Sequence, residues 1–253
     1  MAKLYIGVNN QPKEVKNWYI GINNQPKKVK KAWIGVDGKA KLFYASSRVP
    51  DGYQEVEYIY GGQRAYINPN ISGSSALRIV LDIEPDYNTV CRFGSYIMNN
   101  NGGTSSQYSE YRFELRKEYI RIFFGLHGPQ VNSDPIIVID NLGESIFARH
   151  IWDLNNNGNF YFDNTLLGSS SKILKETESI QLPPIYLFKV PEVAVNSKMK
   201  IYSFKAYENS ILIREMYPCY NKSNNEIGMY DVINNIFYGN ESEYDNFEAG
   251  PIV

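Results

Sequence analysis

The first 45 residues contain one short motif three times. The copies share an aromatic residue followed by Ile-Gly, and they repeat every 14 residues. The aromatic and glycine positions are Tyr5, Gly7, Tyr19, Gly21, Trp33 and Gly35. A unit this short cannot bury a hydrophobic core alone, so the copies must pack on one another or on a partner. The repeat therefore predicts an element for anchoring and assembly, not the core of an enzyme.

Each copy is expected to form a β-hairpin. Ile6 and Val8 flank a glycine in the period-two pattern of a strand, and the later copies repeat it. Turn-forming residues follow each first strand. Asn and Gly suit a tight hairpin turn because they accept positive φ. These turn residues are Asn9-Asn10, Asn23-Asn24 and Asp37-Gly38. Pro12 and Pro26 come after the turn, where a donor to the strand ladder can be spared.

The charge is unevenly distributed along the chain. Residues 1–47 hold nine lysines against Glu14 and Asp37, a net charge of +7, and the whole chain carries -1, which leaves -8 for the remainder. A basic segment is typical of nucleic-acid or anionic-polymer binding. Lysines on exposed strand edges also prevent unwanted strand pairing. Because no nucleic-acid recognition module accompanies the charge, we expect no nucleic-acid partner.

Targeting and cysteine signals are few. The N-terminus lacks a long apolar segment, so we expect no secretory signal, and no apolar run approaches the roughly 20 residues needed to span a bilayer. Cys91 and Cys219 are the only cysteines, and both lie in apolar, strand-like surroundings. We expect buried free thiols, not a disulfide framework.

Residues 46–52 read as a linker of turn formers, and residues 53–253 as a series of strands with almost no helix. The expected strands are 78–84, 111–116, 119–124, 135–140, 148–154, 160–162, 185–188, 198–207, 211–217, 228–232 and 236–238. About a dozen short strands separated by Gly and Asn turns predict a two-sheet antiparallel sandwich. The predicted fold class is all-β, with three hairpins in residues 1–45 followed by this sandwich.

Several blocks are similar to known proteins. The N-terminal copies resemble the "YIGVNGKARKVKK"-type repeats of phage and prophage proteins from low-GC Gram-positive hosts (Firmicutes). The remainder resembles the concanavalin A-like lectin/glucanase (LamG-like) jelly rolls that often follow those repeats. The residues that carry this second resemblance are 49–59, 184–188, Lys200-Ile-Tyr-Ser-Phe-Lys-Ala-Tyr-Glu-Asn209, 211–219, 227–231 and 237–238.

The resemblance implies a non-enzymatic bacteriophage virion protein, made in the host cytoplasm and released by lysis. Residues 1–45 would bind other virion proteins, and the lectin-like sandwich would bind host cell-wall or surface polysaccharide as a tail or baseplate receptor-binding adhesin. The alternative is a decoration protein of the capsid or tail, such as a head fibre, with weak or no glycan binding. Analogy with fibres and decorations also suggests a homotrimer.

Two departures from the family pattern stand out. The first strand of the family commonly carries Tyr-Ile-Glu-Ser-Thr-Gly-Thr-Gln-Tyr-Ile-Asp-Thr, whereas residues 58–68 read Tyr-Ile-Tyr-Gly-Gly-Gln-Arg-Ala-Tyr-Ile-Asn. This change would alter whatever that edge contacts. Asp-Gly turns of the family become Asp163-Asn164 and Asn209-Ser210, and we expect these to keep the turn because Asn accepts its geometry.

A sugar site would combine aromatic platforms with planar polar side chains. Such residues flank the long polar loop at 99–106: Tyr96, Asn99, Asn100, Tyr108 and Tyr111. They are the candidate glycan-binding residues. The alternative is ordinary packing on the sheet, since tyrosine is enriched in strands and the chain has 21 of them.

A glycosidase would need two suitably placed carboxylates. The glucanase branch carries Glu-x-Asp-x-x-Glu on one strand. The nearest match here, Asp82-x-Glu84-x-Asp86, differs in spacing and order and contains Pro85, which would break the strand. Glu55 and Glu57 read as a solvated edge. We therefore expect no catalytic residues and no enzyme activity, with a glycoside hydrolase as the third reading.

Metal sites are also not indicated. His127 reads as a turn residue and His150 as a strand residue, and the two lie far apart in the sequence. Lectin-like sandwiches bind Ca²⁺ through loop carboxylates, but Asp134, Asp140 and Asp153 are scattered. We expect no cofactor and no metal, with a Ca²⁺ site as the alternative.

Overall fold

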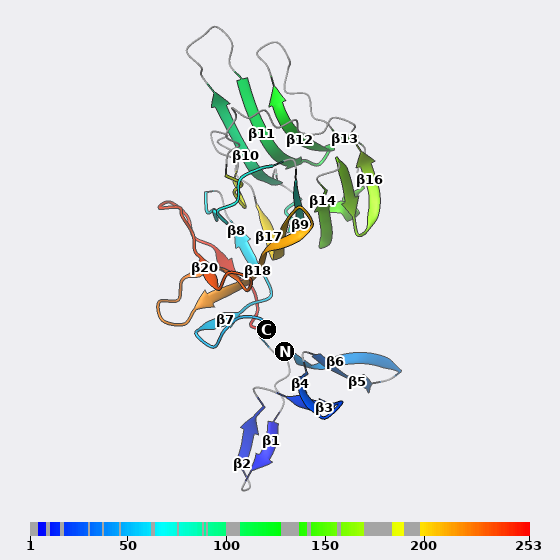
Figure 1. Ribbon diagram of the computed structural model, residues 1–253, viewed down its shortest axis with the longest axis vertical. Helices are drawn as coiled ribbons and strands as arrows, with labels where there is room; N and C mark the ends of the chain where they lie inside the picture. Colours follow the sequence, from blue (N-terminus) through cyan, green and yellow to red (C-terminus); the bar gives the residue numbers. More distant parts are fainter. Residues whose placement is uncertain are drawn as a thin grey trace.

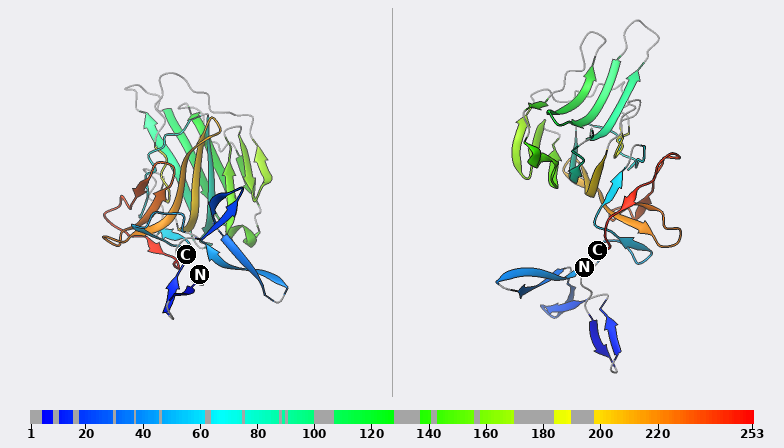
Figure 2. Two further views of the ribbon diagram at one scale, coloured as in Figure 1. Left: turned by 60° about the horizontal axis from the view of Figure 1, so that its bottom comes forward. Right: turned by 180° about the vertical axis from the view of Figure 1, so that it is seen from behind.

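The computed structural model shows an almost entirely β molecule (Figure 1). It describes residues 5–8, 11–15, 18–29, 31–36, 38–45, 47–61, 64–74, 76–87, 89, 91–99, 107–127, 137–140, 143–155, 158–169, 184–189 and 198–253. The three N-terminal hairpins lie at one end of the molecule, near the C-terminus, and the far ends of β10, β11 and β12 lie at the other (Figures 1 and 2).

The three sequence copies form three separate two-stranded antiparallel sheets. Their strands are β1 (Tyr5–Val8), β2 (Gln11–Glu14), β3 (Tyr19–Ile22), β4 (Gln25–Lys28), β5 (Lys31–Val36) and β6 (Lys39–Ala45). The predicted hairpins are therefore present. The hydrogen-bonded ladders described for them stay within each hairpin, so each copy is an independent β unit.

The second hairpin shows why the motif folds this way. Asn23 and Asn24 adopt φ values of 51° and 60°, as a tight two-residue turn requires. Pro26 faces Gly21, one pair beyond the turn-closing pair of Ile22 and Gln25. Alternate pairs of an antiparallel ladder exchange no hydrogen bonds, so the missing N–H of the proline leaves the ladder intact.

The remaining strands form a two-sheet antiparallel sandwich. The smaller sheet has the order β10-β11-β12-β13. Its strands are β10 (Cys91–Asn99), β11 (Gln107–Leu115), β12 (Tyr119–His127) and β13 (Ile137–Asp140). The larger sheet has the main order β16-β15-β14-β9-β17-β18-β19-β20, with β7, β8 and β21 at its margin. Its strands are β7 (Tyr53–Glu55), β8 (Ile59–Gly61), β9 (Leu77–Pro85), β14 (His150–Leu154), β15 (Asn159–Phe162), β16 (Thr165–Ser169), β17 (Met199–Glu208), β18 (Ile211–Asn221), β19 (Ile227–Asp231), β20 (Ile236–Tyr238) and β21 (Glu248–Ala249).

The core lies between the two sheets. Alternate residues of β9 are buried, which sends Ile79, Leu81 and Ile83 into the core while the residues between them face outward. The buried Trp152 meets Phe113 of the smaller sheet edge-on, with ring centroids 5.0 Å apart. Each such side chain stabilises the fold by about 1.5–3 kcal/mol through burial. Trp152 is thus a core residue, as its sequence context suggests.

Most expected strands are present, with shifted ends. Segment 185–188 is an exception, because it forms only isolated bridges, including Leu187 with Ile67, and belongs to no strand. Phe188 there has a φ of 68°, which is incompatible with extended backbone. A short 3-10 helix, η1 (Glu144–Phe147), precedes β14. The turn expectations hold at Asp163-Asn164 and Asn209-Ser210, where all four φ values are positive.

The segment expected to be a linker packs against the sandwich from residue 47 onward. Val49 is buried beside Cys219 and Tyr230. Arg48 donates to the carboxylate of Glu55, with Nε 2.6 Å from Oε1. Glu55 is only 1% exposed, so its prediction as a solvated edge residue is wrong: the arginine neutralises it within the fold.

Both cysteines are buried free thiols, as expected. Burial raises the pKa of the Cys91 thiol well above its usual value, and it raises the pKa of Cys219 to about 12. Neither thiol is ionised near neutral pH, so both act as apolar core groups.

Candidate functional site

The predicted glycan-binding residues fall on the hairpin of β10 and β11. In its register Asn99 faces Gln107, and Tyr111 faces Ser95. Strand alternation puts positions 96 and 108 on one face of the sheet and positions 99 and 111 on the other, which is also the face of the buried Phe113. These four positions are close along the hairpin but divided between its faces. Their side chains, and Asn100 entirely, lie outside the described residues.

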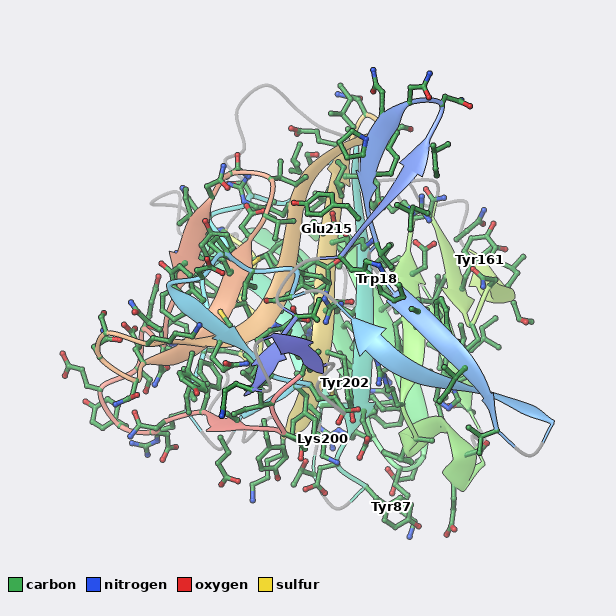
Figure 3. The ribbon with its side chains drawn as sticks, turned by 90° about the horizontal axis from the view of Figure 1, so that it is seen from below. Trp18, Tyr87, Tyr161, Lys200, Tyr202 and Glu215 are labelled. Atoms are coloured by element: carbon green, nitrogen blue, oxygen red, sulfur yellow. The ribbon has the colours of Figure 1, made fainter. Side chains whose placement is uncertain are left out.

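The outward surface of the larger sheet carries a second, fully described set of polar and aromatic groups. We call it the outer face, formed by outward side chains of β8, β9, β14, β17 and β18. Figure 3 views this face from below. The labelled Lys200 and Tyr202 of β17 lie close together, whereas Glu215 of β18 and Tyr161 of β15 lie apart from them. Its charged groups are paired across neighbouring strands, because cross-strand neighbours of opposite charge attract.

One of these pairs lies at the start of β9 and another on β17 and β18. Arg78 donates from Nε and Nη2 to the two carboxylate oxygens of Asp153, at 2.9 and 2.6 Å. Lys205 lies 3.0 Å from Glu215, which also accepts a hydrogen bond of 2.5 Å from the Tyr217 hydroxyl. Burial and this hydrogen bond raise the pKa of Tyr217 to about 12, so its hydroxyl stays protonated and donates.

A denser cluster surrounds Glu84. Its carboxylate accepts from Lys200 Nζ at 2.6 Å and from the Tyr202 hydroxyl at 2.7 Å. Burial alone would raise the pKa of Glu84, but the two hydrogen bonds outweigh it, and the pKa lies below its usual value. Arg149 binds Asp82 through two hydrogen bonds of 2.9 and 2.8 Å and lies 3.7 Å from the centre of the Tyr202 ring. Glu84 is therefore ionised at neutral pH and fixed in position.

A cavity of about 450 Å³ opens beside this cluster, where β9 ends. Its lining residues are Tyr60, Glu84, Pro85, Asp86, Tyr87, Phe147 and Lys200. β9 runs through Pro85 and stops there, which places the following two residues on the cavity wall. Three residues of the 82–86 sequence pattern, Glu84, Pro85 and Asp86, thus line a cavity. From the sequence, the pattern reads only as a poor match to a catalytic motif. The contributions of β8, β17 and η1 depend on strand order and could not be read from that pattern.

The carboxylates of Glu84 and Glu215 are hydrogen-bonded acceptors without the raised pKa of a general acid. Hydrolysis needs one carboxyl group kept protonated as the acid, which requires a raised pKa. The pKa of Glu84 is lowered instead, and so is that of Glu215, where burial would raise it but hydrogen bonds from Tyr217 and Lys205 prevail. Both are hydrogen-bond acceptors at neutral pH.

The two histidines lie in different sheets, His127 on β12 and His150 on β14. His150 begins β14, with Nδ1 2.6 Å from Asp163 and Nε2 2.8 Å from the carbonyl oxygen of Ser145. His127 is the last residue of β12, where it pairs with Tyr108, so the prediction of a turn residue at this position is wrong. Among the residues described here, no group of three or more His, Cys, Asp or Glu side chains is arranged to hold a metal ion.

The hairpins expose a third set of groups, the apolar residues of the repeats. Tyr19 and Trp33 are 55% and 56% exposed, and their neighbours Ile20 and Ile34 are exposed as well. Consecutive strand residues face opposite sides, so both faces of these hairpins are apolar and uncovered. Gly21 and Gly35 have open space where a Cβ would lie, so they leave the surface between the large side chains flat.

Comparison with known proteins found no matching family model, no matching curated protein and no matching solved structure. Within the part of the chain that the structure describes, no helix has the length and apolar character to cross a bilayer.

Proposed function

We propose that this chain is a non-enzymatic bacteriophage structural protein, a tail or baseplate adhesin of the virion. Its N-terminal hairpins attach it to other virion proteins, and its concanavalin A-like sandwich binds polysaccharide on the host cell surface. The observation that carries the proposal is the contrast between the two parts. The sandwich buries its own core, whereas the hairpins leave Tyr19 and Trp33 more than half exposed.

The hairpins fit an attachment role on physical grounds. An isolated two-stranded hairpin is at best marginally stable in water, so three of them with uncovered apolar faces gain most by binding a partner. The lysines that surround these faces favour a partner with negative charge. The sequence resemblance to phage repeats supports a particle as that partner.

The sandwich fits a binding role. Beside its outer face, Tyr60 and Tyr87 line a cavity together with the ionised, hydrogen-bonded carboxylate of Glu84, the combination that takes the apolar and hydroxyl sides of a sugar. Many copies on one particle would convert weak single contacts into firm adhesion.

The test is sedimentation of the full chain with purified Gram-positive cell walls and, separately, with phage particles that lack the protein. The proposal expects both to occur, with no release of reducing sugar from the walls. Trp33→Glu, on the exposed hairpin face, should abolish only particle binding.

Three results would contradict parts of the proposal. Binding to particles without binding to walls would support the decoration protein. Release of reducing sugar that is lost in Glu84→Gln would support the hydrolase. Unimpaired particle binding by Trp33→Glu would remove the hairpins from the attachment role.

A further inference from the structure

The cavity at the end of β9 has one apolar wall. Tyr87 and Phe147 meet edge to face there, with centroids 5.0 Å apart and an interplanar angle of 81°. The Tyr87 hydroxyl donates to Glu144 at 3.1 Å, which fixes the ring. Lys117 Nζ lies over the same ring, 4.6 Å from its centre. The ring face away from Lys117 is a platform for the C–H face of a pyranose.

The opposite wall is polar and equally fixed. Glu84 is held by Lys200 and Tyr202, and the Tyr60 hydroxyl donates to Asp86 at 3.1 Å. A carboxylate has about four acceptor sites, so one already bound by the protein still accepts from a ligand hydroxyl. The ammonium group of Lys200 has three N–H donors and makes one hydrogen bond to Glu84, so it can also donate to a ligand oxygen.

The size and charge of the cavity narrow the ligand class. A volume of about 450 Å³ falls within the roughly 300–1,000 Å³ of small-molecule sites. Of the charged residues that line the cavity, Glu84 and Asp86 are negative and Lys200 is positive. An anionic ligand would meet net repulsion in this setting, whereas the hydroxyls of a neutral sugar would meet acceptors.

We propose that this cavity is a saccharide subsite that takes a neutral hexopyranose unit. The ring of the sugar lies against Tyr87, and its hydroxyls donate to Glu84 and Asp86. The subsite rests on the proposed glycan binding by the sandwich, and it places that binding on the outer face instead of the β10–β11 hairpin.

The experiment is saturation-transfer NMR of the full chain with defined probes. Methyl glucopyranoside, methyl galactopyranoside and methyl N-acetylglucosaminide are the neutral probes, and glucuronate and glycerol phosphate are the anionic ones. At least one neutral probe should receive saturation, with the anionic probes weaker. Tyr87→Ala should weaken binding of that probe by about ten-fold, which corresponds to about 1.4 kcal/mol.

Two further variants separate binding from folding. Tyr161→Ala removes another half-buried tyrosine, which lies on β15 away from the cavity (Figure 3), and should leave probe binding unchanged. Asp86→Asn keeps the size of the side chain, and it should weaken binding while the melting temperature stays near that of the wild type.

The possible failures are distinguishable. If the chain binds cell walls but Tyr87→Ala and Asp86→Asn bind both walls and probes as the wild type does, the subsite is wrong and the proposed function stands. If anionic probes bind as well as neutral ones, the ligand class is wrong. If neither walls nor any probe bind, the subsite and the proposed glycan binding fail together.

Discussion

At the scale of single residues, the outer face is organised by carboxylates that have lost part of their hydration and regained hydrogen bonds. Glu84 and Glu215 show the same balance. Burial raises the pKa of each carboxyl group, and hydrogen bonds from a lysine and a tyrosine lower it by a larger amount. The net shift is downward for both. Each therefore stabilises the folded chain more when ionised than when protonated.

A pH dependence follows from the sign of these shifts. Because the folded pKa lies below the unfolded value, the stabilisation is present above the unfolded pKa and is lost as the pH falls through the folded pKa. The melting temperature should therefore drop as the pH is lowered from about 7 to about 3. The drop should be smaller in the double variant Glu84→Gln, Glu215→Gln, measured by calorimetry over that range.

Glu118→Gln is the matched control, because Glu118 is exposed in the turn between β11 and β12. It should follow the pH profile of the wild type. If the double variant also follows the wild-type profile, these two carboxylates do not stabilise the outer face in the way their hydrogen bonds indicate.

At the scale of elements, the strand pattern was readable from the sequence for most strands of the sandwich, although β8 and β10 were not among the expected strands. β9 alternates apolar and charged residues except at Val80, and it was predicted to within one residue at each end. β16 was missed because Thr165–Ser169 carries no alternation, and its pattern in the structure is mostly exposed. The segment 185–188 was wrongly predicted as a strand, because a run of apolar residues also suits a buried segment that forms only isolated β-bridges.

The cavity could not be predicted in the same way. The alternation of Asp82, Glu84 and Asp86 was visible, but the cavity also needs Tyr60, Phe147 and Lys200 from distant parts of the chain. Those come together through the pairing of β8 and β9 with β17, which no local pattern specifies. The hairpins were predictable because each is complete within one repeat.

Close packing between β19 and β20 makes a prediction at this scale. A Cβ on Gly228 would lie 2.2 Å from the carbonyl oxygen of Tyr238, a backbone atom that cannot rotate away. Gly228→Ala should therefore reduce the free energy of unfolding by about 1–3 kcal/mol, the usual cost of overpacking. Urea denaturation measures this loss.

Gly52→Ala is the control for that measurement, because nothing lies within 4 Å of a Cβ at Gly52. It should leave the unfolding midpoint almost unchanged. Equal midpoints for the two variants would show that β19 and β20 are less closely packed than the structure indicates.

At the scale of the whole molecule, the chain combines a sandwich that is complete in itself with hairpins that are not. The buried residues of the sandwich run from Val49 to Phe247, and the described core includes no residue of the hairpins. Deleting residues 1–45 should therefore leave the melting temperature of the sandwich nearly unchanged. The same deletion should abolish binding to the particle and leave binding to cell walls intact.

That deletion also tests whether the sandwich folds independently of residues 1–45. A truncated protein that fails to fold, as judged by loss of its cooperative melting transition, would mean that the hairpins stabilise the sandwich. The segment from Ser47 is kept in the truncated chain because Arg48 and Val49 pack against the sandwich.

The most direct test of the central claim is electron microscopy of phage particles labelled with gold-conjugated antibody against the sandwich. An adhesin attached through its hairpins and directed at host polysaccharide should place the gold at the tail tip or baseplate. Gold over the head would contradict this account and make the protein a capsid decoration, and particles without gold would remove the virion assignment altogether.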